Sequence, residues 1–199
     1  MVGRRRTKDH YSKQAARENY PARSIYKLEE IDKRVKLLRT GDRVLDLGAA
    51  PGSWSLYAAQ RVGKGGIVWA VDSSPLKVAV PPNIEYFEAD VMEESFFDYL
   101  NNVIEEKLDV VLSDMAPRTT GHKFVDQSRS FNLFSRALEI ARLKLRPGGR
   151  FAGKIFFGED FNRASENVKN LFEKKRIIKP KSVRKESYEV YITGLNRRP

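Results

Sequence analysis

The chain has 199 residues, of which 37 are lysine or arginine and 26 are aspartate or glutamate, so its formal net charge is +11. It contains no cysteine, which excludes disulfides, zinc sites built on thiolates and cysteine nucleophiles. No apolar run reaches membrane-spanning length and the basic N-terminus lacks the apolar segment of a secretory signal, so we expect a cytoplasmic protein of one domain.

Basic residues are concentrated near the N-terminus. Residues 1–39 carry twelve lysines and arginines against five acidic residues, a balance that favours a polyanionic partner such as RNA. A merely solvated charged surface would give the same composition. Residues 1–20 are polar without a clear period, and we interpret them as a flexible basic arm. Three tyrosines in this region could stack on bases or could be packing residues: Tyr11, Tyr20 and Tyr26.

Residues 21–199 alternate between helical and strand-like segments and are expected to form a single domain. Apolar spacing predicts a first helix over 23–37, in which Lys27 lies beside the apolar stripe. Strands are expected at 43–48, 66–72, 84–90, 108–114, within 148–160, 176–183 and 188–194, and helices at 53–62, 95–106, 126–145 and 159–175. Strands separated by helices predict a doubly wound, mostly parallel α/β sheet. The last two strands have no helix between them, so we expect a hairpin with one antiparallel member.

The first four strands end in glycines or aspartates. Gly48 and Gly52 follow the first strand, and the next three strands end at Asp72, Asp90 and Asp114. Ligands of an open α/β sheet bind beyond the carboxyl ends of its strands, so these residues should share one rim. In that position an acidic residue such as Asp72 usually holds a ribose diol, and Asp90 could accept from an adenine amino group. The alternative is that the aspartates only cap helices and turns.

The rim favours one ligand over others. Its glycine pattern departs from G-x-G-x-x-G, which disfavours a dinucleotide, and its acidity suits a cation better than a phosphate. S-adenosylmethionine has adenosine, no phosphate and a positive sulfonium, so we expect it as the cofactor. No metal site is expected.

Two later strands are each interrupted by a charge. Lys154 lies in an apolar stretch within 148–160, and Glu189 in one within 188–194. An unpaired buried charge is costly, so these side chains either pair with each other or carry out chemistry.

Five segments together resemble the FtsJ/RrmJ family of RNA ribose 2′-O-methyltransferases. They are RSIYKLEEID (23–32), DLGAAPGSW (46–54), SDMAP (113–117), GKIF (153–156) and SYEVYITG (187–194). The resemblance covers the chain from about residue 20 to its end. It implies a Rossmann-like class I methyltransferase fold of seven strands with the last one antiparallel. It also implies methyl transfer from S-adenosylmethionine to a ribose 2′-hydroxyl, with a uridine in large-subunit ribosomal RNA as the favoured substrate.

The resemblance also implies site residues. The catalytic residues would be Lys27, Asp114, Lys154 and Glu189. The cofactor would contact Gly52, Trp54, Asp72, Asp90 and Asp114. We add Gly48, where the backbone can approach a ligand closely. Lys154 can act as a base only after losing its proton, which burial and the Lys27 charge favour and the two carboxylates oppose. A fixed ammonium that stabilises a developing alkoxide is the alternative role.

Other functions stay open at this point. A transfer RNA could be the substrate, the protein could bind RNA without catalysis, or the acceptor could be a small molecule. The complete set of four charged residues disfavours RNA binding without catalysis, and the basic N-terminal arm disfavours a small-molecule acceptor. Ribosomal RNA or the large ribosomal subunit is the expected partner, and no obligate protein partner is evident. Arg118 and Lys123 flank the expected site and are candidates for phosphate contacts, whereas His122 is more typical of a solvated loop residue.

Overall fold

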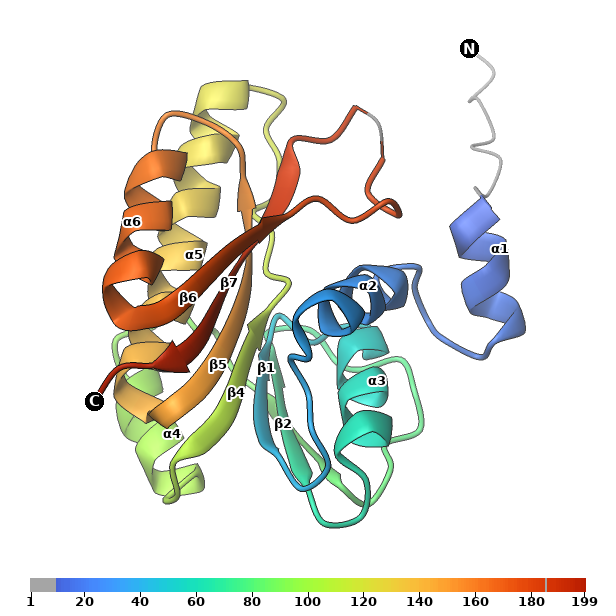
Figure 1. The fold of residues 1–199 in the computed structure, drawn as a ribbon. Coiled ribbons are helices and arrows are strands. Elements are labelled where there is room, and N and C mark those ends of the chain that lie inside the picture. The colour runs from blue at the N-terminus through green and yellow to red at the C-terminus, as the bar shows by residue number, and fades with distance from the viewer. Residues whose placement is uncertain (1–9, 185) are drawn as a thin grey trace.

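The computed structural model describes residues 10–184 and 186–199. Its centre is a seven-stranded sheet with the order β3-β2-β1-β4-β5-β7-β6 (Figure 1). The strands are β1 (Arg43–Leu47), β2 (Ile67–Asp72), β3 (Ile84–Glu88), β4 (Leu108–Ser113), β5 (Leu145–Phe156), β6 (Phe172–Ile178) and β7 (Glu189–Arg197). The helices are α1 (His10–Arg17), α2 (Ile25–Val35), α3 (Ser53–Val62), α4 (Phe96–Val103), α5 (Lys123–Lys144) and α6 (Phe161–Leu171).

The sheet is parallel except at β7. That strand runs antiparallel to both β5 and β6, while every other neighbouring pair is parallel. The mostly parallel α/β sheet and the antiparallel last strand predicted from the sequence are therefore confirmed. The chain crosses from β3 over to β4 on the other side of β1, so the carboxyl ends of β1 and β4 form the switch point at which such sheets bind ligands.

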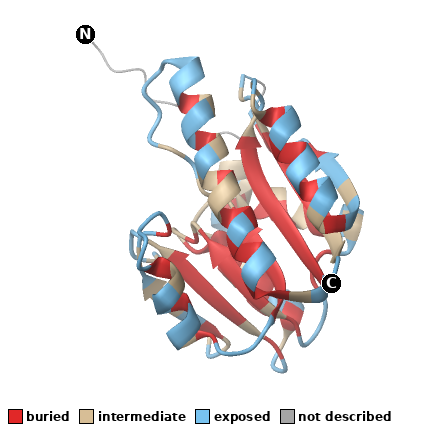
Figure 2. Cartoon of the chain, turned by 90° about the vertical axis from the view of Figure 1, so that its left-hand side faces the viewer, coloured by how far each residue is buried: buried red, intermediate tan, exposed pale blue. Residues whose placement is uncertain are grey.

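Hydrophobic side chains fill both faces of the sheet. One core cluster joins the strands to α4, α5 and α6 through residues such as Phe96, Phe134 and Phe161. The other cluster joins them to α2 and α3 through residues such as Leu28 and Val62. Figure 2 shows buried strands behind helices whose outer sides are exposed. Within the part of the chain that the structure describes, no helix is long and apolar enough to cross a membrane.

The structure differs from the expected boundaries at α6. This helix ends at Leu171, whereas the apolar pattern extended it to residue 175. Phe172 instead begins β6, where it is 1% exposed and its ring stacks on Phe151 with centroids 6.1 Å apart. Tertiary packing of one large side chain therefore overrides the local helical pattern.

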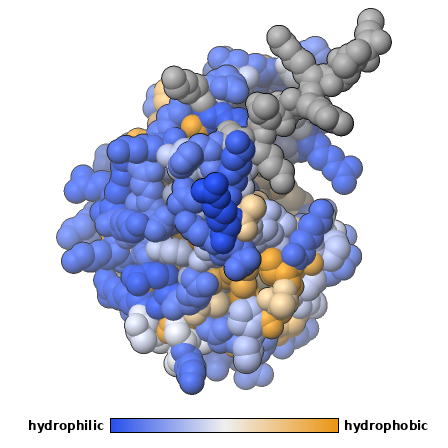
Figure 3. Space-filling view, turned by 90° about the vertical axis from the view of Figure 1, so that its right-hand side faces the viewer, coloured by the Kyte–Doolittle hydropathy of each residue, from blue (hydrophilic) through white to orange (hydrophobic). Residues whose placement is uncertain are grey.

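Part of the N-terminal segment is helical. Residues 10–17 form α1, within the stretch 1–20 in which the sequence shows no clear period and predicts a flexible basic arm. Ala15 is 2% exposed and packs in a small cluster with residues of α2, so burial of a short apolar face supports this helix. Residues 1–9 of the expected arm lie outside the described residues. The side of the molecule that carries α1 is mostly hydrophilic, with one hydrophobic patch (Figure 3).

The three N-terminal tyrosines are packing residues. Tyr26 is 7% exposed and donates its hydroxyl to Glu18 at 2.8 Å. Tyr11 packs at 5.6 Å from Tyr26, measured between ring centroids. Tyr20 is half-buried in the same cluster and donates to Gln60 at 2.8 Å. Their rings fasten α1 to α2, which favours the packing interpretation over base stacking.

Candidate active site

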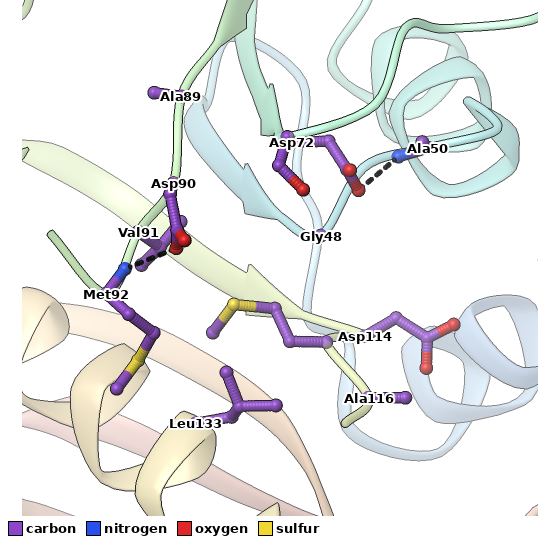
Figure 4. A pocket seen from close by; sticks show the side chains of 12 residues that line it. Gly48, Ala50, Asp72, Ala89, Asp90, Val91, Met92, Asp114, Ala116 and Leu133 are labelled. Carbon is purple, nitrogen blue, oxygen red and sulfur yellow. Dashed lines mark hydrogen bonds between the residues drawn. The ribbon is translucent and has the colours of Figure 1, made fainter. Parts of the chain in front are cut away.

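A cavity of about 330 Å³ opens at the carboxyl ends of the central strands (Figure 4). Four of the predicted cofactor residues line it: Gly48, Asp72, Asp90 and Asp114. The remaining lining residues are small, apolar or uncharged: Ala50, Ser73, Ala89, Val91, Met92, Met115, Ala116 and Leu133. Among the described residues, the wall therefore carries three carboxylates and no lysine or arginine.

Backbone hydrogen bonds orient two of these carboxylates. Asp72 accepts from the amides of Ala50 and Ser74, both at 2.9 Å, through its two different oxygens. Asp90 accepts from the amide of Met92 at 2.9 Å, and Figure 4 shows its carboxylate at the cavity. Because each carboxylate oxygen can accept more than one bond, these turn contacts fix the side chains and leave acceptor capacity for a ligand.

Gly48 is required by the geometry of the switch point. Its φ angle is +77°, and a Cβ placed there would lie 2.7 Å from Cγ and 2.9 Å from the backbone N of Met115. The loop after β1 and the loop after β4 therefore touch through backbone, which narrows the floor of the cavity. Any side chain at this position would force the two loops apart.

Two predicted cofactor residues do not line the cavity. Trp54 is 2% exposed, donates its indole N–H to the carbonyl of Ser24 at 2.8 Å, and packs 5.7 Å from the Tyr191 ring. Gly52 has a φ angle of +113° and faces Val78 at the start of α3. Both residues brace the loop that leads from β1 into α3.

The structure brings the four predicted catalytic residues together from four different elements. The Nζ atom of Lys27, on α2, lies 2.5 Å from Oε1 of Glu189 at the start of β7. The Nζ atom of Lys154, on β5, lies 3.1 Å from Oδ1 of Asp114, directly after β4, and also donates to the Asp114 carbonyl. Between 6% and 14% of each side chain is exposed, so these are nearly buried ion pairs.

Sheet register explains the first part of this convergence. Ser113 is paired with Gly153 in the parallel β4–β5 ladder, so the next residue on each strand is Asp114 or Lys154. On the other side, Lys154 is opposite Tyr191 in the antiparallel β5–β7 ladder.

Contacts outside the sheet bring α2 to the same place. Arg23, just before α2, donates to the carbonyl of Ser182 at 2.6 Å. Glu30, on α2, accepts from the amide of Lys181 at 2.7 Å. These bonds hold the helix against the loop between β6 and β7, which projects over it in Figure 1, and so place Lys27 beside Glu189.

Tyr191 joins the two ion pairs and was missed in the sequence. Its hydroxyl oxygen lies 2.6 Å from Oδ1 of Asp114 and 2.7 Å from Oε1 of Glu189. Burial, together with the two neighbouring carboxylates, raises the pKa of Tyr191 well above its ordinary value, so the hydroxyl keeps its proton as a donor. The available signal was spacing, because residues two apart on a strand share a face.

Asp114 is ionised in this cluster. Burial alone would raise its pKa, but the charges of Lys154 and Lys27 and the hydrogen bonds from Tyr191 and Lys154 oppose it. The net result is a pKa below the ordinary value for aspartate. Asp114 also lines the first cavity, so a fixed negative charge faces that space.

A second unusual carboxyl lies beneath the cavity. Asp46 on β1 is 0% exposed; its Oδ2 accepts from the Ser55 hydroxyl at 2.6 Å, and its Oδ1 has no hydrogen-bond partner among the residues that the structure describes. Burial, with smaller contributions from the charges of Asp114 and Asp72, raises the pKa of Asp46 to about 7. The sequence contained this residue in the DLG motif, but the motif gave no indication of its burial.

A second cavity, of about 500 Å³, opens on the other side of the cluster. Lys27 and Glu189 line it. The other lining residues come from the segment before α2, the loop into α5 and its first turn, the end of β5 and the loop between β6 and β7: Arg23, Thr119, Gly121, Asp126, Phe156, Val183, Arg184, Glu186, Ser187 and Tyr188. Asp126 holds one loop by accepting from the amides of Thr120 at 2.8 Å and Gly121 at 3.2 Å. The charged cluster therefore separates an acidic cavity, reached by Asp114, from an open cavity of mixed charge.

Comparison with known proteins gives a consistent result. The profile of a family described as FtsJ-like methyltransferase matches residues 20–197. A protein of Sorangium cellulosum named ribosomal RNA large subunit methyltransferase E is 50% identical over 96% of this chain and 88% of its own length. A protein of the same name from Oleidesulfovibrio alaskensis is 51% identical, over 94% and 91%.

Solved structures agree in fold. A Plasmodium falciparum crystal structure described as a ribosomal RNA methyltransferase superposes with a TM-score of 0.78 at 25% identity, over 89% of this chain and 98% of that one. Fibrillarin of Aeropyrum pernix, solved with S-adenosyl-L-methionine natively bound, superposes with a TM-score of 0.60 at 17% identity, over 86% of this chain and 76% of the fibrillarin chain. At that identity the second likeness concerns the fold alone.

Proposed function

The chain belongs to the FtsJ-like methyltransferase family, and on this premise we propose that it transfers a methyl group from S-adenosylmethionine to the 2′-hydroxyl of a uridine in large-subunit ribosomal RNA. Membership also confirms the resemblance found in the motifs. The observation that carries the proposal is the charged cluster between two cavities. The sequence leaves transfer RNA open as the substrate, but both relatives are named as ribosomal RNA methyltransferases, which favours ribosomal RNA.

The residues of the first cavity suit S-adenosylmethionine. The described wall carries three carboxylates; Lys154 balances the charge of Asp114, and the excess negative charge of the other two would repel a phosphate and attract a positively charged ligand. We assign Asp72 to the ribose diol and Asp90 to the adenine amino group, with the backbone at Gly48 approaching the ligand closely. Direct contacts from Gly52 and Trp54 stay a prediction.

The four charged residues are assigned to the acceptor. When bound, S-adenosylmethionine supplies an electrophilic methyl group. Lys154 Nζ, within 3.1 Å of Asp114, is placed to hold the 2′-hydroxyl and to stabilise the negative charge that develops on its oxygen. As the oxygen–methyl bond forms and the sulfur–methyl bond breaks, the hydroxyl proton would pass to the ionised Asp114 carboxylate and from there to water. The side chain is held in place by its ion pair with Asp114 and its hydrogen bond to the Asp114 carbonyl, so a fixed cation is the role that we propose.

The Lys27–Glu189 pair faces the second cavity, where the RNA would enter. In the cluster, the two positive charges of the lysines balance the two negative charges of Glu189 and Asp114. Tyr191 holds Asp114 and Glu189 at a fixed separation, and such fixed groups reduce the reorganisation needed at the moment of transfer.

The proposal is tested by mapping methylated riboses. Unmethylated ribosomal subunits and transfer RNA would each be incubated with the protein and S-adenosylmethionine, and alkali-resistant linkages located in both. We expect one new site, at a uridine of large-subunit RNA. A site in transfer RNA only, or RNA binding without any new 2′-O-methyl group, would contradict the proposal.

A further inference from the structure

Three exposed aromatic side chains belong to segments that border the second cavity: Tyr188 lines it, Phe157 follows the lining residue Phe156, and Phe124 lies two residues before the lining residue Asp126. They are Phe124, Phe157 and Tyr188, which are 65%, 57% and 44% exposed. Among the described residues only one other aromatic side chain is comparably exposed, Tyr99 on α4. We call these three residues the aromatic rim. Exposed aromatic rings are costly to hydrate, and their concentration at one place requires an explanation.

Contacts between three elements bring the aromatic rim together. The amide of Phe157, just after β5, donates to the carbonyl of Tyr188 at 2.8 Å. The side chain of Gln127, on α5, donates to the carbonyl of Phe157 at 2.6 Å. Phe124 lies three residues before Gln127, and therefore on the same side of α5.

The aromatic rim is continuous with the charged cluster. Tyr188 lines the second cavity and directly precedes Glu189, whose carboxylate meets Lys27 at 2.5 Å. The ring of Phe156, which lines the same cavity, contacts Tyr188 edge-on with centroids 6.3 Å apart. A ligand that lies on Tyr188 would thus extend into the space where the acceptor hydroxyl is expected.

Charges near the aromatic rim indicate what covers it. Among the described residues of 118–129, 157–163 and 184–188, exposed cations outnumber exposed carboxylates: Arg118, Lys123, Arg129, Arg163 and Arg184 against Glu159 and Glu186. Lys123 Nζ lies over the Tyr188 ring, 5.3 Å from its centroid, and Arg163 lies 5.3 Å from the Phe131 ring. Aromatic faces interleaved with cations are typical of surfaces that bind single-stranded nucleic acid, because bases stack on the rings and phosphates meet the cations.

We propose that the aromatic rim is a stacking platform for unpaired bases next to the target nucleotide, so that the protein selects RNA that is single-stranded at the site. This inference rests on the proposed RNA substrate. A surface cation–π contact is weaker than base stacking, so Lys123 would leave the Tyr188 ring for a phosphate when RNA binds. A protein partner would not need the surrounding cations.

Binding measurements without a methyl donor test the platform. The probes are a fluorescein-labelled single-stranded RNA 12-mer and a duplex of the same composition. We expect Tyr188→Ala and Phe124→Ala each to weaken single-strand binding by about fivefold or more, since removing one stacked base costs at least that much. Duplex affinity should change by less than about twofold, because a duplex hides its base faces.

Matched variants separate stacking from folding. Tyr188→Phe keeps the ring and should bind the single strand as the unmodified protein does. Leu143→Ala removes an exposed apolar side chain at the opposite end of α5 and should also leave binding unchanged. A 2-aminopurine base in the 12-mer should be quenched on binding, and Tyr188→Ala should remove that quenching.

Three results would overturn the inference: unchanged single-strand affinity in both alanine variants, equal loss for single strand and duplex, or altered self-association with intact RNA affinity. The last result would make the surface a protein interface. Failure of the proposed methyl transfer would be distinguishable from failure of the platform. A protein that stacks bases through Tyr188 but methylates no RNA would support the platform and contradict the proposed reaction.

Discussion

Replacing Asp46 by asparagine should flatten the pH dependence of the protein's stability. The carboxyl is fully buried, one of its oxygens lacks a hydrogen-bond partner within residues 10–184 and 186–199, and burial raises its pKa to about 7 in the folded protein. In the unfolded chain the same group titrates near pH 4. Between these values the unfolded state releases a proton that the folded state keeps, so stability falls as the pH rises.

The size of the effect follows from the two pKa values. A difference of about three units corresponds to about 4 kcal/mol at about 1.4 kcal/mol per unit, fully expressed above pH 7. About 2 to 3 kcal/mol of it should appear between pH 5 and pH 8. Urea unfolding of the unmodified protein and Asp46→Asn at both pH values measures it, because the other titrating groups cancel in the difference between the two proteins.

A second variant should shift the effect in the opposite direction. Ser55 donates to Asp46 at 2.6 Å and thereby favours its ionised form. Ser55→Ala should therefore raise the pKa of Asp46 further and steepen the loss of stability above pH 5. The reasoning is refuted if Asp46→Asn differs from the unmodified protein by the same free energy at pH 5 and pH 8.

Two further changes probe the site. Gly48→Ala should lower the free energy of unfolding by about 1–3 kcal/mol, because it places a Cβ 2.7 Å from Met115 at a position with a positive φ. The same change should reduce the rise in melting temperature that S-adenosylmethionine gives, and an unchanged rise would contradict the assignment of Gly48 to the cofactor site. Tyr191→Phe removes a hydrogen bond that lowers the pKa of Asp114, so the acid limb of the methylation pH profile should move to higher pH. A limb that stays in place would show that Asp114 does not set it.

The fold was largely predictable because its signals are local. Strands alternating with helices specify the parallel units, and the missing helix before β7 specifies the antiparallel hairpin. The exceptions arise where long-range packing decides. Phe172 leaves a helical pattern to stack on Phe151, and α1 forms because Ala15 finds a cluster on α2.

The site was predictable in its charges and not in its connections. Lys154 and Glu189 interrupt apolar strands, which a sequence reveals directly. The bridging hydroxyl of Tyr191 depends on strand register, and the raised pKa of Asp46 depends on burial. The hydrogen bond from the Trp54 indole N–H to the Ser24 carbonyl likewise depends on tertiary packing, and the ligand contact that its motif implies stays a prediction.

The role of Lys154 tests the central claim most directly. Lys154→Met keeps the length of the side chain and removes the charge beside Asp114. Lys144→Met is the matched control, because it removes the charge of another buried lysine, whose Nζ donates to Asn101 and to the carbonyl of Ile104, away from the two cavities. Single-turnover methylation and calorimetric binding of S-adenosylmethionine would be measured on both. We predict that Lys154→Met transfers methyl groups at least about a hundredfold more slowly with cofactor affinity within about threefold, while Lys144→Met keeps both. Turnover near that of the unmodified protein in Lys154→Met would contradict the account.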